Sequence, residues 1–236
     1  MSKTVALPFT MRTEAPRVSA RARDLWMNAT NPRDRGLRVG NAVAEATPVY
    51  LYDMIGEWGV TASDFVAALG TVTTKSIDMH INSPGGDVFD GVAIHAALVN
   101  HPATVNVLVD GIAASAASFI AMAGDTIGIE KPATMMIHDA QGLVWGNQAD
   151  MLKAAAIVGQ LSDTIAGVYA DRAGGTPAAW RAAMLDETWY TSAEAVAAGL
   201  ADSVLNDNAP PAPDPAPAED RATQLIRARA RVTLRG

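Results

Sequence analysis

The sequence predicts an α/β domain with a largely parallel sheet. Apolar runs typical of strands alternate with helical patterns from about Thr47 onward. Two segments of small residues, 82–87 and 111–118, each lie between a predicted strand and a predicted helix. Hydrophobic residues make up 49% of the 236 residues, which is enough for a substantial core.

Each predicted strand is a short apolar or β-branched run bounded by turn residues. These runs cover residues 49–52, 76–81, 104–109, 126–129 and 135–137. The predicted helices rest on apolar spacing and on signals at their ends, such as an N-cap at Thr61 or Ser63 and a stop at Gly199. They cover residues 61–69, 90–100, 114–123, 149–172, 177–185 and 193–198.

The composition divides the chain into four parts. Residues 1–45 are rich in arginine and lack periodicity, which predicts a basic N-terminal arm that is flexible or a pro-segment. Residues 46–206 form the predicted globular domain. Residues 207–219 are a linker rich in proline and alanine. Residues 220–236 are a basic tail, either solvated or a short helix that docks on a partner.

Several classes of protein are disfavoured by the composition. The formal charge of −7 argues against a general nucleic-acid binder, and the lack of cysteine rules out disulfides and thiolate chemistry. No apolar run reaches about 18 residues, so no membrane span is expected. No secretory leader is visible, which fits a cytoplasmic protein. No phosphate-binding loop is visible, so the chain has no evident means of hydrolysing ATP. We expect no metal or cofactor.

The two small-residue segments indicate acyl-transfer chemistry. A glycine pair, Gly85-Gly86, lets backbone N–H groups approach a substrate closely. The second segment places a hydroxyl at a helix start, where free N–H groups can hold a developing anion. A serine nucleophile needs a general base and an orienting acid.

His138 is the favoured base among the four histidines, because it ends a predicted strand, where parallel sheets place their sites. His80, His95 and His101 have simpler explanations as strand or helix residues. Spacing alone leaves the acid open among several carboxylates: Asp87, Asp125, Asp139, Asp186 and Glu187.

From about Val49 to Leu205, the chain resembles the family of Clp protease proteolytic subunits (ClpP). The motifs that carry the resemblance are Asn82-Ser83-Pro84-Gly85-Gly86, 111–115, Met136-Ile137-His138, and Glu194-Ala195-Val196 with the glycine that follows it. Three phrases are similar to the subgroup of head maturation proteases of tailed phages: Glu57-Trp58-Gly59-Val60-Thr61-Ala62, 86–91, and Glu187-Thr188-Trp189.

The resemblance implies a ClpP/crotonase-like spiral of parallel strands and helices, with a protruding strand–helix handle at 141–172. It implies a serine endopeptidase that works inside a homo-oligomeric ring, often heptameric, single or double. The subgroup implies cleavage of capsid or scaffold proteins in the host cytoplasm, within the assembling prohead. The alternative is a Clp-type subunit that works with a separate ATP-driven unfoldase of the AAA+ class.

The resemblance also assigns the site residues. Ser115 is the implied nucleophile and His138 the implied base. Aligning the chain on Glu194-Ala195-Val196 puts Glu187 where the family has Asp, with the neighbouring Asp186 as a rival. The implied oxyanion hole is formed by the backbone N–H groups of Gly86 and Ala116.

Three other hypotheses remain. A crotonase acting on acyl-CoA shares the fold but does not need these serine and histidine motifs. An enzyme like the signal peptide peptidases would need a lysine as the base in a Ser–Lys dyad. The chain has four lysines, none at a suitable position: Lys3, Lys75, Lys131 and Lys153. An inactive structural ring subunit is kept open by the glutamate at the acid position.

Overall fold

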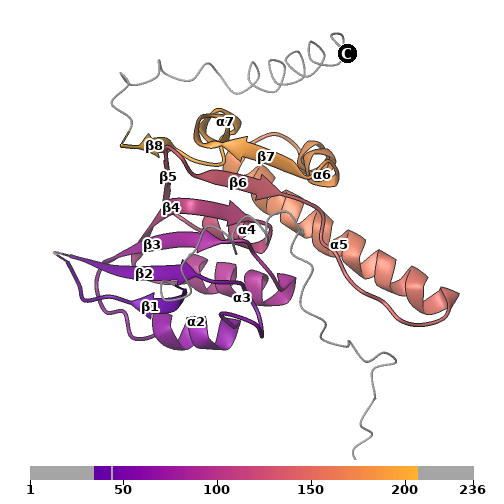
Figure 1. Ribbon diagram of the computed structural model, residues 1–236, viewed down its shortest axis with the longest axis horizontal. Coiled ribbons are helices and arrows are strands. Elements are labelled where there is room, and N and C mark those ends of the chain that lie inside the picture. Colours follow the sequence, from indigo (N-terminus) through magenta and orange to yellow (C-terminus); the bar gives the residue numbers. More distant parts are fainter. Residues whose placement is uncertain (1–34, 44, 207–236) are drawn as a thin grey trace, which may run out of the picture.

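The computed structural model describes residues 35–43 and 45–206. They form an eight-stranded sheet in the order β1-β2-β3-β4-β5-β8, and β6 pairs with both β4 and β7 (Figure 1). Helices pack against this sheet, so the predicted α/β class is confirmed. Apart from residues 35–43 and 45, the expected arm lies outside the described residues, as do the linker and the basic tail.

The strands are β1 (Gly36–Val39), β2 (Ala46–Tyr52), β3 (Ser76–Ser83), β4 (Thr104–Ala114), β5 (Thr126–Glu130), β6 (Thr134–Ile137), β7 (Thr188–Thr191) and β8 (Ser203–Leu205). The helices are α2 (Ala62–Leu69), α3 (Val88–Val99), α4 (Ala116–Ala121), α5 (Gln148–Ala173), α6 (Pro177–Leu185) and α7 (Ser192–Ala198). The predicted elements appear in the expected order, and the structure adds three short strands that the sequence analysis did not predict: β1, β7 and β8. Thr61 and Thr191 cap α2 and α7 through their side chains.

The sheet is parallel except at two places. β2, β3, β4, β5 and β8 pair in parallel, and so do β4 and β6. The pairs β1–β2 and β6–β7 are antiparallel. β1 pairs with β2 from Gly36↔Tyr52 to Val39↔Val49, so residues 36–39 belong to the sheet and not to the arm expected over 1–45.

The core lies between the sheet and the helices: α2, α3 and α4 sit together along one side of the sheet (Figure 1), and α5, α6 and α7 contribute buried residues to the same cluster. Alternate residues of the central strands are fully buried, as Met79 and Val107 illustrate. Phe65 of α2 and Ile94 of α3 are buried within the same cluster. This alternation gives the sheet a buried apolar face and a half-buried opposite face.

β4 is longer than its sequence pattern predicts. We expect a strand that ends at Val109 and a helix that begins at Ala114, but β4 continues to Ala114 and α4 begins at Ala116. Gly111, Ala113 and Ala114 have weak intrinsic strand preference. Their backbone groups are paired because β3 lies on one side and β6 on the other, with Ser83↔Ala113 and Ala114↔Met136 in register. Neighbouring strands therefore override local propensity here.

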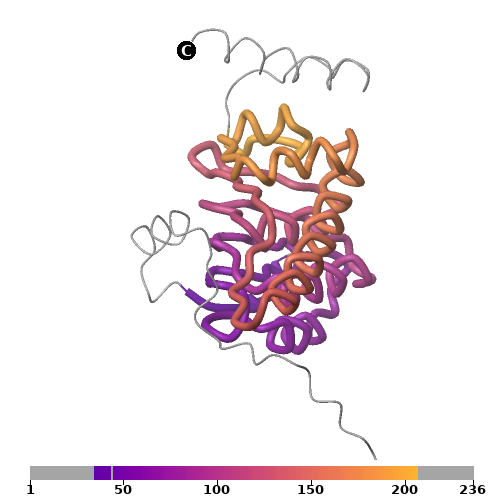
Figure 2. The backbone as a smooth tube through the Cα atoms, turned by 90° about the vertical axis from the view of Figure 1, so that its right-hand side faces the viewer, coloured from indigo at the N-terminus to yellow at the C-terminus, as the bar shows by residue number. Residues whose placement is uncertain are grey.

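The handle predicted over 141–172 is only partly as expected. Helix α5 is present, and Figure 1 shows its N-terminal half reaching away from the sheet, while in Figure 2 the helix runs across the side of the body that faces the viewer. Residues 138–147 form no strand in the described chain, because no neighbouring strand is there to share a ladder. Apolar side chains are exposed on this projection: Leu143, Trp145, Met151, Leu152 and Ile157. Within the described ranges, no helix is long and apolar enough to cross a membrane.

Candidate active site

Ser115 occupies the turn between the end of β4 and the start of α4. Its backbone has φ 54° and ψ −125°, a conformation that is strained for a residue with a side chain. Its N–H donates to the Met136 carbonyl at 2.9 Å. The side chain makes no capping bond to α4. The turn therefore presents the Ser115 hydroxyl outward instead of using it to end the helix.

Two buried side chains, Ser118 and Tyr169, stabilise the Ser115 turn through a chain of hydrogen bonds. Ser118 Oγ donates to the Ser115 carbonyl at 2.6 Å and lies 2.7 Å from Tyr169 OH on α5. Because the single Ser118 proton is already donated, Tyr169 is the donor in the second bond. Burial raises the pKa of Tyr169, which keeps it protonated. Sequence reasoning missed both residues, although Ser118 lies one helical turn after the predicted nucleophile.

The glycine pair Gly85-Gly86 packs directly against the Ser115 turn. Both glycines have positive φ, 86° and 154°. A Cβ on Gly85 would lie 2.4 Å from the Ala114 oxygen and 2.7 Å from Ser115 Cβ. A Cβ on Gly86 would lie 2.0 Å from the Ile55 oxygen. Only glycine fits this close approach of two backbones.

Two backbone N–H groups near Ser115 are free to hold an anion. Ile55 N–H donates to the Gly85 carbonyl, and Asp87 N–H donates to the Ile55 carbonyl. This pattern leaves the Gly86 N–H without a main-chain acceptor in the part of the chain that the structure describes. The Ala116 N–H is the first of α4 and has no acceptor within its own helix. The arrangement suits an oxyanion hole.

His138 faces the Ser115 hydroxyl. Its Nε2 lies 2.7 Å from Ser115 Oγ. The register of β4 and β6 explains the distance, because Ala114 pairs with Met136 and each side chain lies just beyond that pair. His138 is only 9% exposed. Burial lowers the pKa of His138, and the carboxylates of Glu187 and Asp139 partly oppose this. The neutral imidazole, which can accept a proton, is thus favoured at neutral pH.

His138 contacts Ser115 through Nε2, but no carboxylate is hydrogen-bonded to its other ring nitrogen, Nδ1, among the described residues. His138 Nδ1 is buried and has no hydrogen-bond partner among the described residues. Glu187 follows α6 with φ 49°, and its Oε1 accepts a bond from Trp189 Nε1 at 3.2 Å. Asp186 is exposed at the C-cap of α6. Of these two neighbours, Glu187 is the one whose charge raises the pKa of His138.

The other carboxylates considered from the sequence have structural partners. Asp87 caps α3 by accepting from the N–H groups of Phe89 and Asp90. Asp125 accepts from the Val105 N–H at 2.7 Å. Asp139 forms an ion pair with Arg181, a residue that sequence reasoning did not single out.

The remaining histidines make contacts elsewhere in the fold. His80 Nδ1 lies 2.9 Å from Asp110 Oδ2, and its ring stacks on Tyr50. His101 Nδ1 accepts from the Ala103 N–H. His95 is half-buried on α3, where burial lowers its pKa. Within residues 35–43 and 45–206, no group of three or more His, Asp or Glu side chains is arranged to hold a metal ion.

The fold and the serine–histidine pair are those of a serine-type endopeptidase. The family model for Clp protease matches residues 41–208, and the chain belongs to this family. Family membership disfavours the crotonase and Ser–Lys hypotheses.

Three curated relatives are named ATP-dependent Clp protease proteolytic subunit. The one from Pleurastrum terricola is 36% identical over 135 residues, covering 56% of this chain and 68% of the relative. The one from Chara vulgaris is 36% identical over 141 residues, covering 58% and 64%. The one from Chlorella vulgaris is 31% identical over 135 residues, covering 56% and 67%. The chain thus spans about two thirds of each relative's length.

The electrostatics of His138 can be tested by titration. Because burial lowers its pKa from 6.5, we expect an NMR titration midpoint below pH 6.5. Glu187→Gln removes the largest opposing charge and moves the midpoint lower still, whereas Asp186→Asn leaves it unchanged. The group's contribution to the free energy of unfolding falls as the pH drops below 6.5 toward the folded-state pKa. A midpoint that moves with Asp186→Asn alone would favour the rival carboxylate.

Proposed function

We propose that this chain is the proteolytic subunit of an ATP-dependent protease and hydrolyses peptide bonds with Ser115 as nucleophile. The observation that carries the proposal is the 2.7 Å contact between Ser115 Oγ and His138 Nε2, beside two uncommitted N–H groups. The names of the three relatives favour this reading over the phage role.

The proposed mechanism uses four groups in two half-reactions. His138 takes the Ser115 proton as Oγ attacks the peptide carbonyl, and the N–H groups of Gly86 and Ala116 hold the oxyanion. His138 then gives the proton to the leaving amine. Water, activated by the same imidazole, hydrolyses the acyl-enzyme and regenerates the Ser115 hydroxyl.

Glu187 is the carboxylate that we assign to orient His138. Its charge acts on the imidazole, and the Trp189 indole holds one of its oxygens nearby. The buried Nδ1 has no partner within residues 35–43 and 45–206, and an unsatisfied group of this kind costs about 1–3 kcal/mol. Catalytic hydrogen bonds often tighten only in the substrate complex. We therefore expect Nδ1–H to donate to Glu187 when substrate is bound.

We infer two kinds of partner: a separate ATP-driven unfoldase and other copies of this chain. No phosphate-binding loop for ATP is visible in the sequence, so ATP hydrolysis would come from a separate unfoldase. The exposed apolar side chains of the projection, Leu143 and Trp145 before α5 and Met151, Leu152 and Ile157 on it, suit contacts between copies in a homo-oligomeric ring, for which seven subunits is the expected number.

The phage reading is a second candidate. The phrases 57–62, 86–91 and 187–189 favour it, because they are similar to head maturation proteases. In that role the same site would cleave capsid or scaffold proteins during head assembly and need no unfoldase. The two readings share the chemistry and differ in substrate and partner.

The nucleophile and the base can be tested with a fluorophosphonate probe that reacts with activated serines. We expect the wild type to be labelled on Ser115, while Ser115→Ala is not labelled and His138→Ala loses at least about 10²-fold in rate. His80→Ala and His101→Ala serve as controls and keep wild-type labelling. Equal losses in all three histidine variants would mean that the base is misassigned, and an unreactive wild type would favour the inactive ring subunit.

The two readings can be separated with a folded substrate and a short peptide. As a Clp-type subunit, the protein cleaves the peptide unaided but degrades the folded substrate only with an AAA+ unfoldase and ATP. The control is Ser115→Ala with the same unfoldase. Site-specific cleavage of a capsid or scaffold protein without ATP would favour the phage reading instead.

Assembly can be tested by native mass spectrometry of the full chain. We expect a homo-oligomer, with seven subunits or fourteen for a double ring, and Trp145→Asp shifts it toward smaller species because a charge enters the apolar contact. Trp145 is 94% exposed in the single chain, so the substitution should not affect folding. A monomeric wild type would contradict the ring, and intact masses would show whether either end of the chain is removed.

A further inference from the structure

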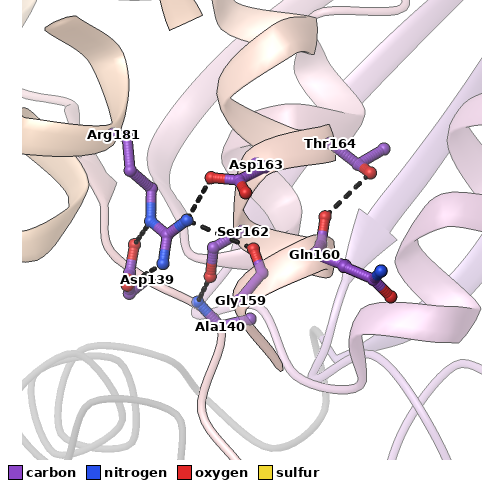
Figure 3. Close-up of polar contacts among 8 residues, drawn as sticks. All are labelled: Asp139, Ala140, Gly159, Gln160, Ser162, Asp163, Thr164 and Arg181. Carbon is purple, nitrogen blue, oxygen red and sulfur yellow. Dashed lines mark hydrogen bonds and ion pairs between the residues drawn. The ribbon is translucent and has the colours of Figure 1, made fainter. Parts of the chain in front are cut away.

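The residue directly after His138 is held by a two-pronged ion pair. Arg181 of α6 donates from Nε to Asp139 Oδ1 at 2.7 Å and from Nη2 to Asp139 Oδ2 at 2.9 Å (Figure 3). Both side chains are about a quarter exposed, at 24% and 23%. A fork of this kind fixes direction as well as distance, so it is more specific than a single surface contact.

The same guanidinium reaches a second element. Its Nη1 donates to the Asp163 carboxylate and, at 3.2 Å, to the Gly159 carbonyl, both on α5 (Figure 3). The backbone next to Asp139 is also bonded to α5, since the Ala140 N–H donates to Ser162 Oγ at 3.0 Å. Residues 138–140 are thus fastened to α5 and α6 at once.

This fastening matters for His138 because the described residues give its ring a single hydrogen bond, the one to Ser115. Nδ1 has no partner among them, so the position of the ring depends on that bond, on the packing around the buried side chain and on the course of its own backbone. That course is set one residue later, where Asp139 is locked to Arg181 and its N–H donates to the Met184 carbonyl at 3.1 Å.

The fork also balances charge next to the imidazole. Two carboxylates act on His138: Glu187, from the segment after α6, and Asp139, from the same loop as the histidine. Each favours the protonated imidazolium, which cannot accept a proton. Arg181 places a fixed positive charge against Asp139 and so offsets one of the two.

We propose that Arg181 is a positioning residue: it holds residues 138–140 against α5 and α6 and offsets the charge of Asp139, so that His138 meets Ser115 as a neutral base. This inference rests on the proposed function of Ser115 and His138. The competing explanation is a surface ion pair that joins α5 to α6 and has no effect on the site.

The test measures the rate constant of fluorophosphonate labelling of Ser115 as a function of pH. In Arg181→Met, we expect the plateau rate to fall about tenfold. We also expect the rise of the rate with pH to shift upward by about one unit, because the unbalanced Asp139 carboxylate stabilises the imidazolium. A role limited to joining two helices would move neither quantity.

Two further variants separate position from charge. The double variant Asp139→Asn/Arg181→Met removes both charges, so its pH midpoint moves back below that of Arg181→Met while its plateau rate stays low. Arg181→Lys keeps the positive charge but loses the fork, so its midpoint stays near wild type and its rate is intermediate. Should Arg181→Met fail to fold, Arg181→Lys still tests the inference, because a wild-type plateau rate would overturn it.

The matched control is Arg172→Met, which breaks the ion pair of Arg172 on α5 with Asp202 at 2.6 Å. We expect it to keep the wild-type rate and pH dependence, with thermal melting recorded for every variant. A folded Arg181→Met protein with wild-type rate and pH dependence overturns the inference alone. A similar loss in Arg172→Met also overturns it, whereas an unreactive wild type overturns the proposed function itself.

Discussion

The rest of the site depends on one constraint, the pairing of the last residues of β4 with strands on both sides. Ala113 pairs with Ser83 of β3, and Ala114 pairs with Met136 of β6. Parallel strands end at the same edge of a sheet, so the segments that come directly after these three strands must meet there. Those segments carry the glycine turn, Ser115 and His138. The backbone hydrogen bonds of the sheet therefore position the segments that carry the glycine turn, Ser115 and His138.

The close approach at this edge is demanding for the backbone and is supported from the core. Ser115 has a positive φ, and Gly85 packs where no side chain fits. The bonds from Ser118 and the buried Tyr169 hold the turn in this shape, so strain in the turn is offset by packing and hydrogen bonds beneath it. The same burial removes water from His138 and lowers its pKa, which favours the form able to accept a proton.

Helices α5 and α6 connect the site to the outer surface of the molecule. Tyr169 on α5 reaches the serine side of the site, and Arg181 on α6 reaches the histidine side through Asp139. The other end of α5 projects from the body (Figure 1), and its exposed side chains include apolar ones. Helix α5 therefore contributes both to the support of the Ser115 turn and to the projecting surface.

The sequence by itself determined the features that depend on neighbours along the chain. The α/β alternation, a cap at Thr61 or Ser63 and the stop at Gly199 arise from local patterns, and motifs marked Ser115 and His138 as candidates. Only the tertiary structure decided that β4 runs on to Ala114, that β1 joins the sheet, and that Arg181 meets Asp139 across 42 positions. These features depend on partners distant in sequence. Local propensity carries no information about such partners, and short segments take whatever conformation pairs their backbone groups.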